Sequence, residues 1–309
     1  MSDRYSFIRA TREQVETIRK SLGTDEEDIK RAITSVRDWL RMQPHLPDEI
    51  EDARIERMYI NCKCSIERVK KGLDAYFSLK TRHPEMMMNR DPRGPDVVNT
   101  MEHVKVVTMP RLTEYLYRVH IFADADPDPV WVSWPNYGKI VSMNLDMMLF
   151  NDYSLGDIVI VDLKNLTAGH ALRTDINIIR AIEFGYKTAY CRSLKALHLI
   201  NADKVIDFAM KILSSVLSKK LQTRTHIHLP GSKTLFDHVA KEYLPDELGG
   251  TAGPIDKLAY EFIRRAEEKK EWFVEQDRYT SDESKRPPDN HYADDMYGVA
   301  GSFKKLSVD

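Results

Sequence analysis

The stretch that decides the fold spans residues 190–231 and reads YCRSLKALHLINADKVIDFAMKILSSVLSKKLQTRTHIHLPG. Two short apolar runs within it, residues 195–200 and 225–229, predict β-strands. The segment between them, from Asp203 to about Leu221, has helical periodicity. Strand, helix and strand in about forty residues predict one right-handed parallel crossover unit.

The helix expected in this unit is apolar around much of its circumference. At 100° per residue its apolar side chains cover roughly 200°, against about 100° for a helix that covers one surface. One apolar side can pack on the sheet, and the other needs a second apolar partner. That partner is either another helix or an apolar ligand, in which case this helix forms one wall of a cavity.

The segments on either side of this unit repeat the alternation of strands and helices. Residues 117–122 and 157–163 predict strands, and the second run, DIVIVDL, is almost continuously apolar, as in a strand covered on both faces. Residues 136–150, about 175–189 and 255–277 predict helices. We therefore predict an α/β fold with a mostly parallel sheet and helices on its faces.

The start of the chain reads as helices alone. Thr11 with Gln14 and Thr24 with Glu27 have capping-box spacing at the starts of two of these helices. A stretch rich in Pro and Gly, residues 89–95, follows the helices. We expect three parts: an N-terminal helical bundle at residues 1–90, an α/β domain at 91–277, and a polar tail at 278–309 that is disordered or draped on the surface.

Charge and composition exclude several functional classes. The 309 residues include 46 basic and 48 acidic side chains, so a net charge of −2 gives no general attraction to nucleic acid, and we expect no nucleic-acid partner. Three cysteines are too few for a disulfide framework and fit a reducing compartment. The polar N-terminus lacks a signal-peptide core, and no apolar run is long enough to cross a bilayer. We therefore expect a cytoplasmic protein that can contact a membrane surface peripherally.

Candidate catalytic and metal-binding groups are few. The sequence contains no Gly-x-Ser-x-Gly elbow, no Walker loop and no dinucleotide fingerprint. His198, His226 and His228 could ligate zinc, but hydrogen-bonded structural histidines are the simpler interpretation. Asp162 and His170 could act as acid and base, but no third group accompanies them, and we expect them to fix a loop. We therefore predict no catalytic residue, no metal and no cofactor.

Basic residues gather around the crossover unit. Lys195 begins its first strand, while Lys219, Lys220 and Arg224 follow its helix. The fourth helix of the N-terminal bundle contributes Lys63, Lys70 and Lys71. These charges are either a solvated surface or, if they converge, a local anion site suited to lipid head groups.

Four ordered motifs carry a family resemblance. They are DLKNLTAGH, LHLIN, THIHLPG and LPDELGG, at residues 162–170, 197–201, 225–231 and 244–250. Their order and spacing resemble the CRAL-TRIO lipid-binding proteins, in the branch of alpha-tocopherol transfer protein and retinaldehyde-binding protein. Residues 58–86 resemble the helical domain that precedes the lipid domain in that branch, and the C-terminal tail is similar to tails of insect members.

This resemblance implies a CRAL-TRIO α/β lipid-binding domain, in which a mobile gate helix in the crossover unit covers a cavity for one small hydrophobic ligand. By alignment, the cavity wall would comprise Ile140, Met143, Val161, Ile182, Tyr186, Tyr190, Leu194, Leu197 and Leu217. A basic cleft that meets phosphoinositide membranes in some members would fall on Lys71, Lys195, Lys220 and Arg224. Cys62 and Ser193 stand at two positions that are basic in the tocopherol branch.

The chain departs from the family pattern at two further places. Asn165 stands where the family usually has glycine, and asparagine tolerates a left-handed turn. Residues 214–217, SSVL, stand where many members have Lys-Pro-Phe-Leu. We therefore expect the hinge of the gate helix to behave differently in this chain.

The function that the resemblance implies is intracellular binding and transfer of a small hydrophobic lipid: a tocopherol, a retinoid, another isoprenoid or a phospholipid. Release would be assisted by transient contact with anionic, phosphoinositide-containing membranes. The alternative is a lipid-sensing adaptor, whose ligand-bound form binds another protein without bulk transfer. Neither function is enzymatic, and we expect the chain to be a monomer.

Overall fold

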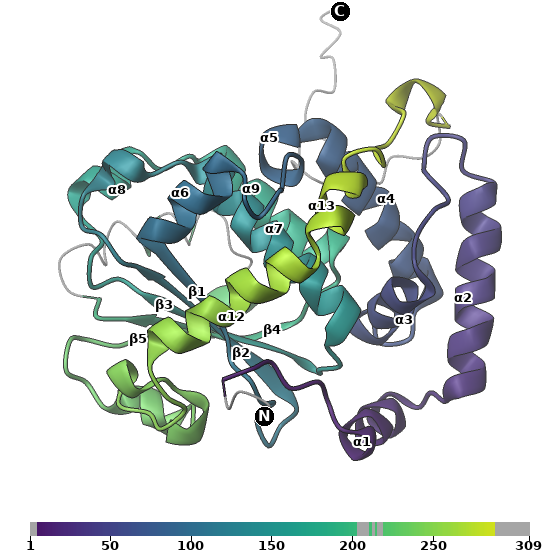
Figure 1. Ribbon diagram of the computed structural model, residues 1–309. Helices are drawn as coiled ribbons and strands as arrows, with labels where there is room; N and C mark the ends of the chain where they lie inside the picture. The colour runs from purple at the N-terminus through teal and green to yellow at the C-terminus, as the bar shows by residue number, and fades with distance from the viewer. Residues whose placement is uncertain (1–4, 203–209, 212–213, 215–218, 288–309) are drawn as a thin grey trace, which may run out of the picture.

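The structure is a computed structural model that describes residues 5–202, 210–211, 214 and 219–287. The predicted gate helix and its hinge therefore lie largely outside the described residues, as does Leu217. Helices and strands keep one set of labels throughout (Figure 1).

A five-stranded sheet, in the order β1-β2-β3-β4-β5, forms the centre of the described part of the chain (Figure 1). β1 pairs with β2 in antiparallel fashion, and the other neighbours are parallel. The strands are β1 (Val104–Thr108), β2 (Tyr117–Asp124), β3 (Gly156–Asp162), β4 (Leu194–Ile200) and β5 (Thr225–Ile227). This sheet, together with the helices around it, confirms the predicted α/β fold. β1 is the strand that the sequence did not predict.

Both faces of the sheet are covered, as the sequence of β3 predicted. Successive side chains of a strand point to opposite faces. Ile158 and Ile160 join one buried cluster with Leu258 of α12 (Ile255–Glu268), whereas Val159 and Val161 pack in another cluster. One face of the sheet is therefore covered partly by α12, and the other is left for the helices that follow β2 and β3.

The N-terminal helices are α1 (Arg12–Leu22), α2 (Glu26–Arg41), α3 (Asp52–Asn61), α4 (Ile66–Arg82) and the short α5 (Pro84–Met87), and α1 to α4 gather on the right of Figure 1. The box of Thr11 and Gln14 is confirmed, because both of its hydrogen bonds are present. The predicted box of Thr24 and Glu27 is wrong. Asp25 caps α2 instead and exchanges hydrogen bonds with Asp28, since the helix starts one residue later.

Two further helices cover the second face of the sheet. They are α7 (Trp134–Asn151) and α9 (Ile176–Phe184), which is continued by a π-helical segment, η2 (Gly185–Ala189). α6 (Pro95–His103), between the bundle and β1, was not predicted. The remaining elements before β5 are η1 (Pro129–Trp131), α8 (Ala168–Leu172) and α11 (Lys219–Gln222).

The chain beyond β5 begins with three short 3₁₀ turns, η3 (Thr234–Asp237), η4 (Lys241–Tyr243) and η5 (Asp246–Leu248). The predicted helix 255–277 is present but interrupted at Lys269, so that α12 is followed by a separate α13 (Lys270–Gln276). A last turn, η6 (Glu283–Lys285), lies beside α4, because Arg286 forms an ion pair with the buried Asp74 at 2.9 Å. The predicted boundaries at residues 90 and 277 remain predictions.

The N-terminal helices share a core with the α/β part. One buried apolar cluster joins side chains of α2, α3 and α4 to others of α7 and α9. Asp146 of α7, fully buried, accepts hydrogen bonds from Arg54 (3.3 Å), Tyr76 (3.2 Å) and Arg90 (2.6 Å). The bundle is therefore clamped onto α7 by apolar contacts and by a buried charge network.

Candidate functional site

An apolar cavity of about 220 Å³ lies on the sheet face that α7 and α9 cover. β2, β3 and β4 contribute its floor, and the two helices contribute its walls. Its lining residues are His120, Phe122, Tyr137, Val141, Asn144, Leu145, Val159, Ile179, Ile182, Glu183, Tyr186, Leu194, Leu197 and Leu221. Alternation in β3 brings Val159 to this face, and helical spacing in α9 brings Ile179 and Ile182.

A second hollow of about 150 Å³ adjoins the cavity toward the C-terminal ends of β2 and β3. The two hollows share Phe122 and Tyr137 as lining residues. Asp124 and His170 also line the second hollow. Burial raises the pKa of Asp124 to about 6, and the negative charge of Asp162 contributes to this shift. This end of the site is therefore more polar than the cavity between α7 and α9.

The structure brings together about half of the residues predicted to form the ligand wall. Ile182, Tyr186, Leu194 and Leu197 line the cavity, and Val161 lines the adjoining hollow. The others behave differently: three lie in buried clusters and line neither hollow, namely Ile140, Met143 and Tyr190. Their part in binding stays a prediction.

A buried polar network supports the floor of the cavity. His120 contacts Thr108 Oγ1 (3.0 Å) and Asn144 Nδ2 (3.3 Å) through Nδ1. The hydroxyl of Tyr186 donates to Asp157 (2.6 Å), and Arg192 Nε donates to the same carboxylate (2.9 Å). Burial alone would raise the pKa of Asp157, but Arg192 and His120 hold it below its ordinary value. These polar groups are satisfied by one another and fix the wall in place.

A basic cleft of about 330 Å³ opens where β3 and β4 begin. Lys63 and Lys195 line it, together with Arg192 and Ser193. Burial lowers the pKa of Lys195, and the nearby charges of Lys63, Arg224 and Lys220 lower it further. The cleft is therefore a local concentration of positive charge on a nearly neutral protein.

Of the four predicted head-group residues, Lys195 lines this cleft, whereas Lys220 and Arg224 lie near Lys195 without lining it. Lys195, Lys220 and Arg224 are close enough for their charges to interact, and Arg224 Nη1 donates to the carbonyl of Leu194 at 2.5 Å. Lys71 lies on α4 and does not line the cleft. Lys63, one of the basic residues that the sequence indicated, does line the cleft; it precedes α4 and has a left-handed φ of 53°.

The other candidate groups have hydrogen-bonding roles in the structure. His170 Nδ1 accepts from the backbone N–H of Thr167 at 3.2 Å, and Asp162 accepts from Lys164 N–H and from Asn201 Nδ2. Asn165 does not adopt the left-handed turn that the family glycine suggested, and its amide donates to the carbonyl of Asp124 instead. Both observations fit the interpretation that these residues shape a loop.

The histidines of β4 and β5 form a cluster. His198 Nδ1 lies 3.0 Å from His228 Nε2, and His228 Nδ1 lies 2.8 Å from Thr234 Oγ1. Ring contacts add His226 and His238. Among the residues that the structure describes, no group of three His, Cys, Asp or Glu side chains is arranged to hold a metal ion.

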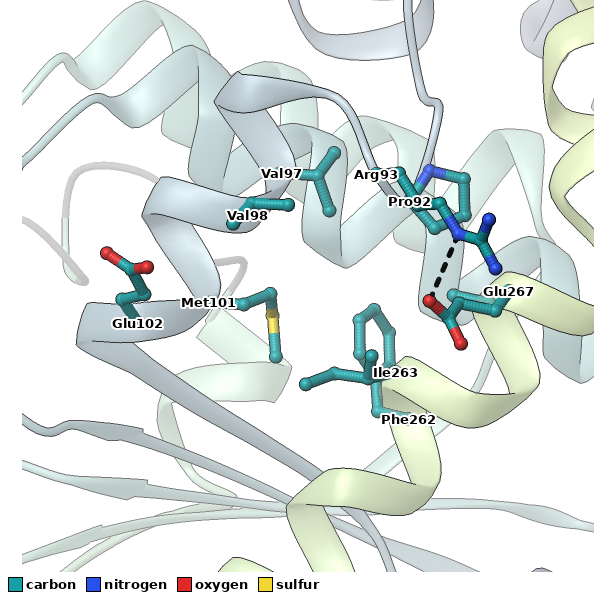
Figure 2. Close-up of a pocket in the computed structure, with 10 residues that line it drawn as sticks. Pro92, Arg93, Val97, Val98, Met101, Glu102, Phe262, Ile263 and Glu267 are labelled. Atoms are coloured by element: carbon teal, nitrogen blue, oxygen red, sulfur yellow. Dashed lines mark hydrogen bonds and ion pairs between the residues drawn. The ribbon is translucent and has the colours of Figure 1, made fainter.

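A separate apolar groove of about 240 Å³ lies between α6 and α12 (Figure 2). Val98 and Met101 face Ile263 across it, and Arg93 pairs with Glu267 at 3.3 Å at one end. None of the predicted ligand or head-group residues lines this groove. The groove is therefore separate from the cavity between α7 and α9.

Comparison with known proteins supports the resemblance. Residues 132–250 match the CRAL/TRIO domain, and residues 25–97 match the family described as Pinta-like, UBA domain. The alpha-tocopherol transfer protein-like protein of Mus musculus is 24% identical over 268 residues, which cover 84% of this chain and 76% of that protein. Clavesin-2 of Mus musculus is 21% identical over 248 residues, which cover 79% of this chain and 76% of that protein.

The crystal structure of Sfh5 superposes with a TM-score of 0.49 at 10% identity, covering 76% of this chain and 91% of that one. In the described part of the chain no helix is long and apolar enough to cross a membrane. Residues 132–250 therefore resemble a CRAL/TRIO domain, and the chain is similar over most of its length to an alpha-tocopherol transfer protein-like protein and to a clavesin.

Proposed function

We propose that this chain binds one small hydrophobic lipid in the cavity between α7 and α9 and transfers it between membranes. A tocopherol, a retinoid, another isoprenoid or a phospholipid belongs to this class. The observation that carries the proposal is the apolar cavity itself, whose floor and walls come from three strands and two helices of the α/β fold. Because the adjoining hollow shares Phe122 and Tyr137 with the cavity, a ligand longer than the cavity can extend into it.

Apolar burial supplies the affinity in this proposal. Each Å² of apolar ligand surface removed from water contributes about 25 cal/mol, so an isoprenoid chain needs no covalent attachment to be held. Asp162 and His170 already have hydrogen-bond partners in their loop, which favours a binding role over a catalytic one. We therefore propose a non-enzymatic carrier.

The basic cleft supports a second part of the proposal, the release of ligand at anionic membranes. Lys63 and Lys195 line the cleft, and the charges of Lys220 and Arg224 lie close enough to lower the pKa of Lys195. A phosphoinositide head group carries several negative charges and would be attracted to such a cleft. In this proposal the head group binds more tightly to the conformation in which the cavity is open. Contact with the membrane therefore shifts the equilibrium toward that conformation and favours release of the lipid.

The setting of this activity is also a proposal. We infer a cytoplasmic monomer that touches membranes peripherally, in the branch of the tocopherol and retinaldehyde carriers and of its insect-type members. The similarity of the chain to the tocopherol transfer protein-like relative supports the branch.

Charge reversal in the cleft tests the membrane step. The double variant Lys220→Glu, Arg224→Glu should slow transfer to phosphoinositide-containing vesicles at least about tenfold, because each basic side chain near an anionic surface contributes about 1 kcal/mol. Transfer of a fluorescent lipid between vesicles measures the rate, and equilibrium lipid loading should stay unchanged.

The matched control is Lys257→Glu, Arg278→Glu, which makes the same charge change at two exposed positions away from the cleft. This control should transfer lipid at the wild-type rate. Equal transfer rates for the cleft variant and the wild type would remove the head-group proposal and leave the cavity proposal standing.

A further inference from the structure

One carboxylic acid lines the apolar cavity. Glu183 lies on α9 between Ile182 and Phe184, and it is half-buried among the lining side chains. Ile179 and Tyr186 are four residues before it and three residues after it, so helical geometry places all three on the face that borders the cavity. The position of this carboxyl therefore follows from the same spacing that builds the wall.

Glu183 has no hydrogen bond and no ion pair with any residue that the structure describes. Burial raises the pKa of its carboxyl, and Lys187, one turn later on the exposed side, lowers it by its charge. A half-buried carboxylate in this position has lost water without gaining a protein donor, which is unfavourable. A donor supplied by a ligand would remove that deficit.

Three of the other polar side chains in the described lining, those of His120, Asn144 and Tyr186, are already engaged. Nδ1 of His120 contacts Thr108 and Asn144, and the Oδ1 of Asn144 accepts from Thr108. The hydroxyl of Tyr186 donates to Asp157. Among the described lining residues, Glu183 and the phenol of Tyr137 therefore keep acceptor capacity for a ligand, and the carboxylate of Glu183 is the stronger acceptor of the two.

We propose that Glu183 determines the specificity of the cavity by accepting a hydrogen bond from a hydroxyl group of the bound lipid. This inference rests on the proposed function and names its ligand class: lipid alcohols and phenols. A hydrogen bond to a carboxylate is stronger than one between neutral groups, and a site that holds an unpaired polar group discriminates against a ligand that lacks the partner. Fatty acids and phosphate head groups are disfavoured in the cavity, since their negative charge would lie against the carboxylate.

Matched ligand pairs test this assignment. The probes are retinol, α-tocopherol and cholesterol, each compared with its own methyl ether, which has the same skeleton but no hydroxyl donor. Affinity is measured for the full chain by competition against a fluorescent lipid. The wild type should bind at least one of the alcohols roughly 10- to 100-fold more tightly than its ether, as expected for one charge-assisted hydrogen bond.

Two variants of Glu183 complete the test. Glu183→Ala should reduce the alcohol-to-ether ratio to near one, and Glu183→Gln should give an intermediate ratio because its amide oxygen is a weaker acceptor. The ratio does not depend on the fraction of folded protein, so partial unfolding does not imitate the effect. Glu102→Gln, a change at the carboxyl that lines the groove between α6 and α12, is the control and should keep the wild-type ratio (Figure 2).

Each outcome has one meaning. Ratios near one in the wild type, or ratios that Glu183→Ala leaves unchanged, overturn the role of Glu183 while the proposed lipid binding stands. Failure of the wild type to bind any alcohol or any ether overturns the proposed function, and this inference falls with it.

Discussion

His198 shows how strongly one side chain depends on its surroundings. Its ring is fully buried, stacks against His226 at a centroid distance of 4.9 Å and lies beside the tilted ring of His228 at 5.2 Å. Burial lowers the pKa of His198 to about 3, and repulsion from the neighbouring imidazoles, including that of His238, adds to the effect. The folded protein therefore needs this imidazole to be neutral.

Acid should consequently destabilise the fold through His198. Its folded pKa lies below the unfolded value near 6.5, so its stabilising effect is complete above pH 6.5 and is lost as the pH falls from 6.5 toward 3. At pH 5 the loss should be about 2 kcal/mol, because one proton contributes about 1.4 kcal/mol per pH unit. Urea unfolding at pH 7.5 and at pH 5 measures it.

The variant His198→Leu isolates this contribution. Its free energy of unfolding should change less between the two pH values than that of the wild type. If both proteins lose stability equally, the pH dependence belongs to other groups.

The alignment with the CRAL-TRIO proteins placed residues at the cavity only where it was locally accurate. On α9 and β4, Ile182 and Leu197 line the cavity, and their contact with a ligand stays a prediction. On α7, the structure places Val141 and Asn144 at the cavity, each directly after a predicted residue, Ile140 or Met143. One residue is a turn of about 100° on a helix, so an alignment shifted by one position exchanges a lining residue for a core residue.

At the scale of elements, buried charges that no sequence pattern indicated hold α7 against the N-terminal helices. Asp146 is fully buried and accepts hydrogen bonds from Arg54 of α3, Tyr76 of α4 and Arg90 after α5. These partners are far apart in the sequence, so periodicity and capping motifs, which report local structure, could not reveal the network. The carboxylate of Asp146 therefore joins α3 and α4 of the bundle to α7, which forms part of the cavity wall.

Removal of that carboxylate should be costly. Asp146→Ala leaves two buried guanidinium groups without their shared partner, and we expect a loss of about 3–5 kcal/mol in the free energy of unfolding. Urea denaturation followed by circular dichroism measures the loss. Asp38→Ala, which breaks an exposed pair with Arg41, is the control and should cost less than about 1 kcal/mol.

A loss for Asp146→Ala as small as that for the exposed pair would mean that the network does not clamp the bundle.

A helix boundary was also missed, because local sequence patterns do not show it. The interruption at Lys269 divides one predicted helix into α12 and α13, although the residues around it are all compatible with a helix.

At the scale of the whole molecule, the sheet separates two environments. One face packs against α12 and the 3₁₀ turns that precede it, and the other face carries the cavity beneath α7 and α9. The basic cleft lies where β3 and β4 begin, next to the ends of α1 and α3. The lipid and the membrane surface would thus contact different places along β3 and β4.

The general architecture of the α/β part could be predicted because strand alternation and ordered motifs are local signals. The contact between the bundle and the sheet could not be predicted, because Lys63 and Lys195 approach each other only through tertiary packing. Residues 278–287 also depend on such packing: Arg286 pairs with Asp74 of α4. Deletion of the predicted tail from residue 278 would therefore disturb the bundle, and a deletion that tests an adaptor role should begin at residue 288.

The central claim is that one apolar lipid occupies the cavity between α7 and α9, and native mass spectrometry of the chain after incubation with lipid vesicles tests it most directly. The wild type should carry one lipid per chain. Ile182→Trp, which fills the cavity, should lose most of this occupancy, whereas Val98→Trp, a matched change in the groove between α6 and α12, should retain it (Figure 2). Wild-type occupancy in Ile182→Trp, or its loss in Val98→Trp alone, would contradict the account.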